Sequence, residues 1–219
     1  MLALLLGAPA GPVAPAAGAP AAAAAPTGER AESAEPAKAP AYRNGVVFGL
    51  ALGGGIGRGA GYPNNSQEIG NPSYRSASGW MPGTGGSLLI MGALADYFDF
   101  GFMFSQDAFR NGTQRAVQDG LGLRIEAFPF VRLVPRLSVL GFLAQFGLGI
   151  GRLSTPGLPQ AGGTQSTIGT GALYEWAFGH FLGGHFGAGP ELEYDAMFSR
   201  PYDQNGLVVL ARVVFYGGP

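Results

Sequence analysis

The fold of this chain is decided by a stretch that reads Phe98-Asp99-Phe100-Gly101-Phe102-Met103-Phe104-Ser105. Successive side chains of a β-strand point to opposite faces, so a strand here presents all four phenylalanines on one face. A helix, with about 3.6 residues per turn, would distribute the same rings around its circumference. The stretch therefore predicts a β-strand with one uniformly apolar face and a second face of mixed polarity.

The same alternation recurs in eight segments after residue 44. One set of alternate positions is apolar in each segment, and these sets span 46–52, 88–94, 98–104, 121–127, 140–150, 168–178, 186–198 and 207–215. The other set is mainly glycine, alanine and charge, and its charged members are Asp99, Asp107, Arg124, Glu126, Glu175, Glu191, Glu193, Asp195 and Arg212. This second set has too few polar groups to serve as the water-facing surface of a soluble barrel. Lipid outside and a polar interior satisfy both sets, as in transmembrane β-barrels.

The composition agrees with a transmembrane barrel and excludes most other classes. Glycine makes up 39 of 219 residues, and charged residues are only 12%, against about 25% in soluble domains. After residue 40 there is no run of about 18 apolar residues that could form a membrane-spanning helix. A net charge of −1 offers no basic surface, so no nucleic-acid partner is expected. With no cysteine and two histidines, we expect neither a metal site nor a cofactor.

The connections between the segments are predicted to alternate in length. The long ones cover 58–82, 109–117, 154–164 and 199–205, and the short ones cover 96–97, 132–136 and 179–183. Outer-membrane barrels have short periplasmic turns and longer outer loops, so the long connections are expected at the cell surface. Aromatic residues near the short turns are expected to form an interfacial girdle: Phe98, Phe100, Phe128, Phe130, Phe178, Phe181, Phe215 and Tyr216.

The N-terminal segment is different in kind from the rest of the chain. Residues 1–41 are rich in alanine and proline and cannot build a core, so a disordered linker is expected there. Residues 2–6 resemble the end of a signal-peptide apolar region, and 8–10 resemble a cleavage site. We therefore divide the chain into a signal-peptide remnant with a disordered linker, 1–41, and a barrel, 42–219. A disordered tail without an export role is the alternative.

In this pattern the chain resembles the small eight-stranded outer-membrane β-barrels of Gram-negative bacteria, of the OmpA transmembrane-domain and OmpX kind. The resemblance covers about residues 44–216 and rests on pattern rather than on a motif. It implies an all-β, eight-stranded antiparallel up-and-down transmembrane barrel in the outer membrane of a Gram-negative bacterium. It also implies outer-membrane lipid and the barrel-assembly machinery as partners. That machinery reads a terminal aromatic residue in such barrels, and here Phe215 is the outward aromatic, with Tyr216 to Pro219 after it.

The inward charges predict a structural network. Eight strands enclose an interior that side chains nearly fill, and buried charges must be paired. The expected members of this salt-bridge network are Arg124, Glu126, Glu175, Glu191, Glu193 and Arg212. A proton or ion path through the same residues, and acid–base catalysis by Glu191 and Glu193, are the alternatives. Residues 55–60 match a loose dinucleotide-binding pattern, but a turn follows them where that pattern needs a helix.

The outer loops are the predicted site of function. Four aromatic residues in or beside them form a candidate contact surface: Tyr62, Tyr74, Trp80 and Tyr202. Loop packing or an outer interfacial belt would explain the same residues. The sequence predicts a structural or adhesive, non-enzymatic role, with the 58–82 loop as the main contact for an extracellular ligand.

Three alternatives to this role stay open. One is an outer-leaflet lipid hydrolase with His180 or His185 as its base, although both histidines lie beside a turn expected on the periplasmic side. The others are a narrow channel and a soluble small-ligand β-barrel.

Overall fold

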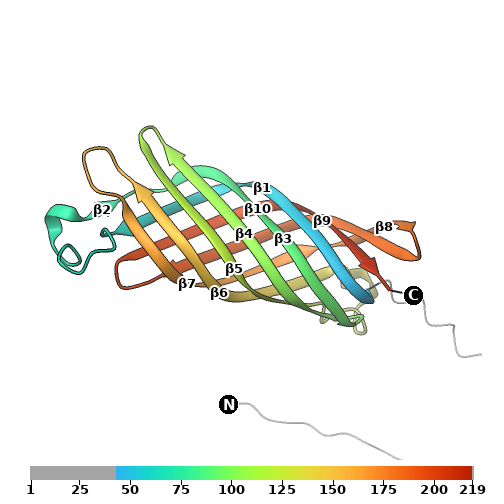
Figure 1. The fold of residues 1–219 in the computed structure, drawn as a ribbon. Helices are drawn as coiled ribbons and strands as arrows, with labels where there is room; N and C mark the ends of the chain where they lie inside the picture. The colour runs from blue at the N-terminus through green and yellow to red at the C-terminus, as the bar shows by residue number, and fades with distance from the viewer. Residues whose placement is uncertain (1–42, 219) are drawn as a thin grey trace, which may run out of the picture. The chain divides into compact units, whose positions relative to one another are not determined.

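The computed structural model describes residues 43–218, which form a single antiparallel β-barrel (Figure 1). The predicted signal-peptide remnant and linker at 1–41 lie outside the described residues. The strands are β1 (Gly45–Gly61), β2 (Ser76–Ala77), β3 (Met81–Ala95), β4 (Phe98–Asn111), β5 (Gln114–Ala127), β6 (Leu140–Ser154), β7 (Ala161–Tyr174), β8 (Trp176–Phe181), β9 (Gly184–Phe198) and β10 (Tyr202–Gly217). Two short 3-10 helices, η1 (Pro72–Tyr74) and η2 (Pro135–Leu137), lie in connections. No helix within residues 43–218 is long and apolar enough to cross a membrane.

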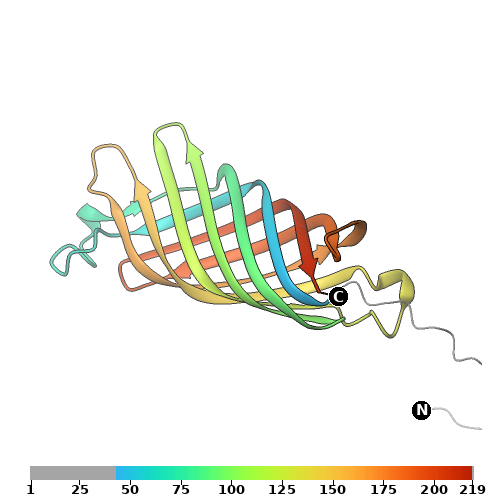
Figure 2. The ribbon, with the colours of Figure 1, turned by 45° about the vertical axis from the view of Figure 1, so that its right-hand side comes forward.

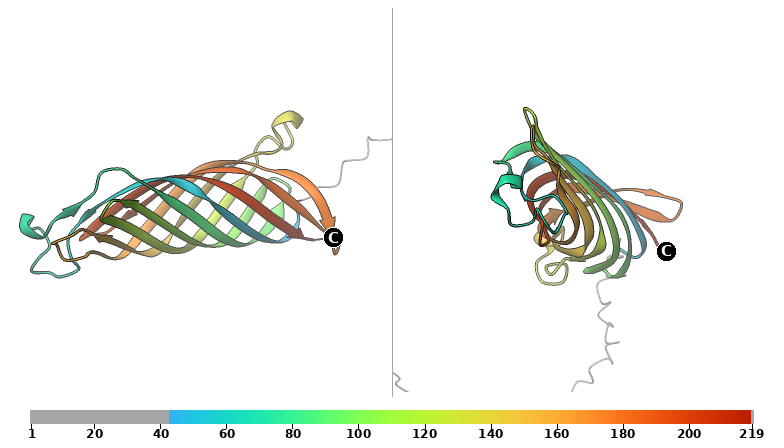
Figure 3. Two further views of the ribbon diagram at one scale, coloured as in Figure 1. Left: turned by 90° about the horizontal axis from the view of Figure 1, so that it is seen from above. Right: turned by 60° about the vertical axis from the view of Figure 1, so that its left-hand side comes forward.

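The barrel has eight strands and is closed. Neighbouring strands follow the order β10-β1-β3-β4-β5-β6-β7-β9, and β9 pairs with β10 to complete the ring (Figures 2 and 3). The short strand β2 only adds to the end of β1, and β8 continues the line of β7 along β9. The predicted eight-stranded antiparallel up-and-down barrel is therefore confirmed.

The interruption between β7 and β8 lies opposite a proline in β9. The ladder between β7 and β9 ends at Leu173 with Glu191 and resumes in β8 at Trp176 with Ala188. Pro190 lies between these two pairs and has no N–H to give to a ladder. On its other side Pro190 remains in register with β10. A break in one ladder thus accommodates a mid-strand proline inside a closed barrel.

The two faces of the barrel have the polarity that the alternation predicts. Outward side chains are apolar and exposed, as at Phe48, 52%, and Phe102, 58%. Inward side chains include Arg124, which is 0% exposed, and Arg212, which is 2% exposed. Apolar groups outside and buried charges inside invert the arrangement of a soluble domain.

The predicted alternation of connection lengths is only partly correct. The 62–80 connection is long and the 96–97 connection is short, as expected. The expected loop at 109–117 is instead a two-residue turn at 112–113, because β4 and β5 continue pairing up to Asn111 and Gln114. The expected short turn at 132–136 is a connection of residues 128–139 that contains η2. Strand length beyond the apolar region is set by backbone pairing, which the apolar pattern does not report.

The two ends of the barrel nevertheless differ. The 62–80 connection and the tips of the β4–β5 and β6–β7 hairpins share one end, which we call the long-loop end (Figures 1 and 2). The 96–97 turn, the 128–139 connection, the β8–β9 hairpin and the end of β10 share the other, which we call the short-turn end.

Candidate functional site

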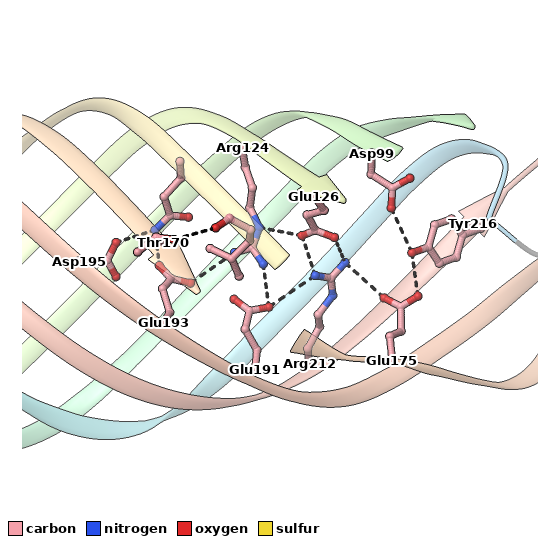
Figure 4. Close-up of polar contacts among 12 residues, drawn as sticks. Asp99, Arg124, Glu126, Thr170, Glu175, Glu191, Glu193, Asp195, Arg212 and Tyr216 are labelled. Atoms are coloured by element: carbon pink, nitrogen blue, oxygen red, sulfur yellow. Dashed lines mark hydrogen bonds and ion pairs between the residues drawn. The ribbon is translucent and has the colours of Figure 1, made fainter. Parts of the chain in front are cut away.

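The centre of the lumen holds two arginines that share carboxylate partners (Figure 4). Arg212 of β10 donates from Nη1 and Nη2 to the two carboxylate oxygens of Glu126 in β5, at 2.6 and 2.7 Å. Arg124 of β5 donates from Nε to the same Glu126, also at 2.7 Å. The carboxylate of Glu191 in β9 lies 2.7 Å from Arg124 and 3.4 Å from Arg212. Charge-assisted bonds of this kind are the strong ones in a water-poor interior.

The network extends from this centre toward both ends of the barrel. Toward the long-loop end, Arg124 contacts Glu193 at 3.3 Å, and Gln145 donates to both Glu193 and Asp195. Toward the short-turn end, the second oxygen of Glu175 lies 3.3 Å from Arg212. The structure thus brings together all six residues that the sequence assigns to the network.

Four residues outside the predicted six also belong to the network. Tyr216, Asp99 and Arg43 join it toward the short-turn end, and Gln145 links Glu193 to Asp195. Tyr216 donates from its hydroxyl to Glu175 at 2.8 Å, and the same hydroxyl oxygen lies 3.3 Å from Asp99. Arg43 donates from Nε to Glu175 at 3.2 Å. Tyr216, Asp99 and Gln145 occupy inward positions of the alternation, so the sequence carries a signal for their faces. Arg43 precedes the first strand, and no periodic pattern reaches it.

Acidic groups outnumber basic groups inside the described barrel. The buried carboxyl residues are Asp99, Asp107, Glu126, Glu175, Glu191, Glu193 and Asp195, and the buried arginines are Arg43, Arg124 and Arg212. Within residues 43–218 there is no group of three or more His, Asp or Glu side chains placed to hold a metal ion. The ion pairs of the lumen network cross-link β5, β9 and β10.

Apolar layers close the lumen on both sides of the network. Near the long-loop end, Met81, Phe109, Leu153, Tyr202 and Val208 belong to one buried cluster with Ala51 and Leu210. Near the short-turn end, one cluster contains Met91, Met103 and Val214, and another contains Phe128, Leu143 and Leu173. The guanidinium of Arg43 lies 3.6 Å from the centre of the Phe128 ring. Side chains therefore fill both approaches to the charged centre.

Glycines on β1 make room for the long-loop-end cluster. A Cβ on Gly57 would lie 2.4 Å from the ring of Phe109, and a Cβ on Gly59 would lie 2.4 Å from the hydroxyl of Tyr202. That hydroxyl donates to Gln204 at 2.7 Å. Two large aromatic rings thus fit inside a narrow barrel because the facing strand has no side chains at these positions.

The placement of Tyr202 corrects the predicted contact surface. The sequence places Tyr202 in an outer connection, but the residue is 1% exposed and points into the barrel, because β10 begins at Tyr202 and not near 207. Trp80 is 48% exposed, with the Arg58 guanidinium 5.1 Å from its ring centre, and Tyr62 and Tyr74 are half-buried in the 62–80 connection. The predicted girdle needs a similar correction, since Phe128 and Tyr216 are buried inside the barrel.

The two histidines lie at the short-turn end. His180 of β8 and His185 of β9 are in register across the hairpin, with ring centres 4.2 Å apart. This end lies opposite the 62–80 connection (Figure 1). A hydrolase that used either histidine would therefore act at the short-turn end.

Exposed charge is distributed unevenly over the outer surface. Six exposed arginines lie at the long-loop end: Arg58, Arg75, Arg110, Arg115, Arg152 and Arg200. The acidic residues of the same described region are Glu68, Asp119 and Asp203. The long-loop end thus has an excess of positively charged side chains, while the described lumen has an excess of negatively charged ones.

Comparisons with known proteins identify a likeness in fold. No protein-family model matches this sequence, and no curated protein matches it. Among solved structures, Ail, the attachment invasion locus protein of Yersinia pestis, is 11% identical with a TM-score of 0.47, covering 78% of this chain and 99% of that one. Neisserial surface protein A is 11% identical with a TM-score of 0.46, covering 77% and 96%. The N-terminal barrel of Pseudomonas aeruginosa OprF is 14% identical with a TM-score of 0.40, covering 77% and 98%. These neighbours are small outer-membrane β-barrels.

Proposed function

We propose that this chain is an integral outer-membrane protein of a Gram-negative bacterium, held in lipid by the outer wall of its barrel. One observation carries the proposal: exposed apolar side chains surround a barrel whose buried interior holds paired charges. Phe48, Phe102 and Leu148 are each at least half exposed on the outer wall. An apolar wall of this extent would be an aggregation surface in water, whereas a bilayer covers it.

The insertion of the barrel into lipid is tested with the full chain expressed in a Gram-negative host. We expect the protein in the outer-membrane fraction and resistant to carbonate extraction. Its mobility on SDS gels should change when the sample is boiled. Circular dichroism of the purified protein in detergent should be of the β type. A protein that is recovered folded and soluble without detergent would contradict the proposal and would favour the soluble-barrel alternative.

We further propose a non-enzymatic interaction role, with residues 62–80 as the main contact for an extracellular ligand. This connection is the longest among the described residues and projects from the barrel end (Figure 1). It contains η1 and carries Trp80 at its base, where an exposed indole next to the Arg58 guanidinium offers the type of anchor found at binding surfaces.

The interaction role is tested by shortening the loop. Replacing residues 64–74 by a brief glycine–serine link leaves the barrel strands intact, and we expect lost adhesion of expressing cells to host-cell or glycan-coated surfaces. Substitution of Thr113, in the neighbouring two-residue turn, is the matched control and should leave adhesion unchanged. Equal adhesion by the wild-type chain and both variants would contradict the role of this loop.

A further inference from the structure

Three outward arginines form a patch on the outer wall of β4, β5 and β6, and we call Arg110, Arg115 and Arg152 the arginine triad. Arg110 and Arg115 are direct cross-strand partners. Arg115 pairs with Ser154, so Arg152, two residues away on the same face, is its diagonal neighbour. Direct neighbours have Cβ atoms about 5 Å apart and diagonal neighbours about 7–8 Å apart, so the three charges share one small surface.

No acidic side chain of the described residues forms a salt bridge with the triad. Arg110 donates from Nε to the carbonyl of Gly112 at 3.2 Å. The nearest outward acid, Asp119, is a diagonal neighbour of Arg152 on the side away from Arg115, and it accepts a hydrogen bond from Gln106 at 2.6 Å. Like charges directly opposite each other destabilise a strand pair. An anion between the guanidinium groups would remove this repulsion.

The same strands become apolar on the side of the triad that faces the short-turn end. Phe104, Leu121 and Leu148 are outward and 46%, 50% and 63% exposed. A shallow cavity of about 370 Å³ on this wall is lined by Asp119, Gly120, Leu121, Leu148, Gly149, Ile150 and Thr164. Ile150 and Arg152 are successive outward residues of β6, so the cavity adjoins the triad. The wall thus places a largely apolar groove, with Asp119 at its end nearest Arg152, beside a positively charged rim.

We propose that the arginine triad binds the phosphate groups of a phosphorylated glycolipid in the outer leaflet, with an acyl chain in the adjoining groove. The proposal rests on the proposed function, in which lipid covers the apolar wall and the 62–80 connection lies at the cell surface. The triad then lies beyond the apolar wall on the cell-surface side, where lipid headgroups are expected. Guanidinium groups match phosphate geometry with paired N–H donors, and arginine is the preferred residue for such contacts. The triad lies on the wall and not on the 62–80 connection, which favours a lipid-borne phosphate over a soluble polyanion.

The experiment compares lipids that differ only in phosphate. The full chain is reconstituted into phosphatidylcholine vesicles that contain either a diphosphorylated glycolipid or the same glycolipid without phosphate. After mild detergent extraction, glycolipid retained per protein is measured over a range of glycolipid content. We expect the wild-type chain to retain the phosphorylated form, and Arg110→Gln, Arg115→Gln and Arg152→Gln combined to weaken its apparent affinity roughly tenfold or more.

A charge-matched variant provides the control. Arg132→Gln, Arg136→Gln and Arg200→Gln together remove the same charge from exposed positions outside the triad and outside the 62–80 connection, so retention should stay near the wild-type value. Equal losses in both triple variants would overturn the site, because they would show a general effect of charge. Retention by the wild-type chain that does not depend on phosphate would overturn it as well.

Two further outcomes separate the possible failures. If heparin or inorganic phosphate in detergent binds the triad as tightly as the glycolipid does, the lipid source is overturned in favour of a soluble anion. If the wild-type chain inserts into phosphatidylcholine vesicles but shows no preference between the two glycolipids, the triad proposal fails and the membrane proposal stands. If the chain inserts into neither vesicle, both proposals fail.

Discussion

Arg212 and Glu126 form a two-point ion pair across the full width of the barrel. Arg212 lies on β10 and Glu126 on β5, and four strand-to-strand steps separate these strands in either direction around the ring. The two hydrogen bonds, at 2.6 and 2.7 Å, join residues 86 apart in the sequence. The pair therefore acts as a brace between opposite walls, at the position where a soluble domain would have packed apolar side chains.

Glu126→Gln is expected to lower the free energy of unfolding by about 3–5 kcal/mol, because it removes the closer of the two carboxylates that the buried Arg212 and Arg124 share. Urea titration of the chain folded in phosphatidylcholine vesicles measures the change. Val213→Ala, on the outward face next to Arg212, is the control and should cost far less. A loss of under about 1 kcal/mol for Glu126→Gln would show that the brace contributes little.

The close fit of Gly57 against Phe109 predicts that a single methyl group disturbs the long-loop end. Gly57→Ala places a Cβ 2.4 Å from the Phe109 ring and should lower the free energy of unfolding by about 1–3 kcal/mol. Phe109→Leu in the same chain should restore part of this loss. Gly79→Ala, where a Cβ meets nothing within 4 Å, should be neutral in the same urea titration. If both glycine variants behave alike, the packing against Phe109 is not the cause.

The lipid-facing wall can be tested with a charge placed at the middle of the apolar region. Phe102→Arg should destabilise the vesicle-inserted barrel by about 2–4 kcal/mol, the cost of a lipid-facing arginine at the bilayer midplane. Trp80→Arg, beyond the apolar region, should cost less than about 1 kcal/mol. Equal costs at the two positions would argue that Phe102 does not face lipid.

The filled lumen predicts little ion flow. In planar bilayers the wild-type chain should show no sustained open level, because Phe109 and Tyr202 occupy the long-loop end. Tyr202→Ala and Phe109→Ala combined should also show no sustained open level, because the central ion pairs and the buried clusters at the short-turn end still fill the lumen. Trp80→Ala is the control for a change outside the lumen. A sustained current through the wild-type chain would favour the narrow-channel alternative.

The faces of the strands are more predictable from the sequence than their ends. Faces follow from a period of two, so the alternation alone places Phe102 and Arg124 on opposite sides of the barrel wall. Strand ends depend on backbone pairing. The pairing of β4 extends to Asn111 and that of β10 starts at Tyr202, and no apolar pattern marks either position. For this reason a residue assigned to an outer loop, Tyr202, lies inside the barrel.

The sequence predicts six residues of the lumen network, but it does not predict every residue that joins them. Six charged residues on the inward set must find partners, and they do so with one another. Arg43 lies outside the alternation, and its contact with Glu175 depends on how the chain enters the barrel. The exact pairing also depends on ring closure, which brings β5 opposite β10 and cannot be read from any local stretch.

The position of Arg212 in the last strand has a consequence for biogenesis. Glu126 and Glu191 both precede it in the chain, and each lacks one of its two guanidinium partners until β10 has docked between β9 and β1. A nascent barrel with β10 missing would hold surplus carboxylates around a single central guanidinium, with an open seam beside them. Docking of the last strand thus closes the ring and supplies the second central guanidinium to these carboxylates in one step.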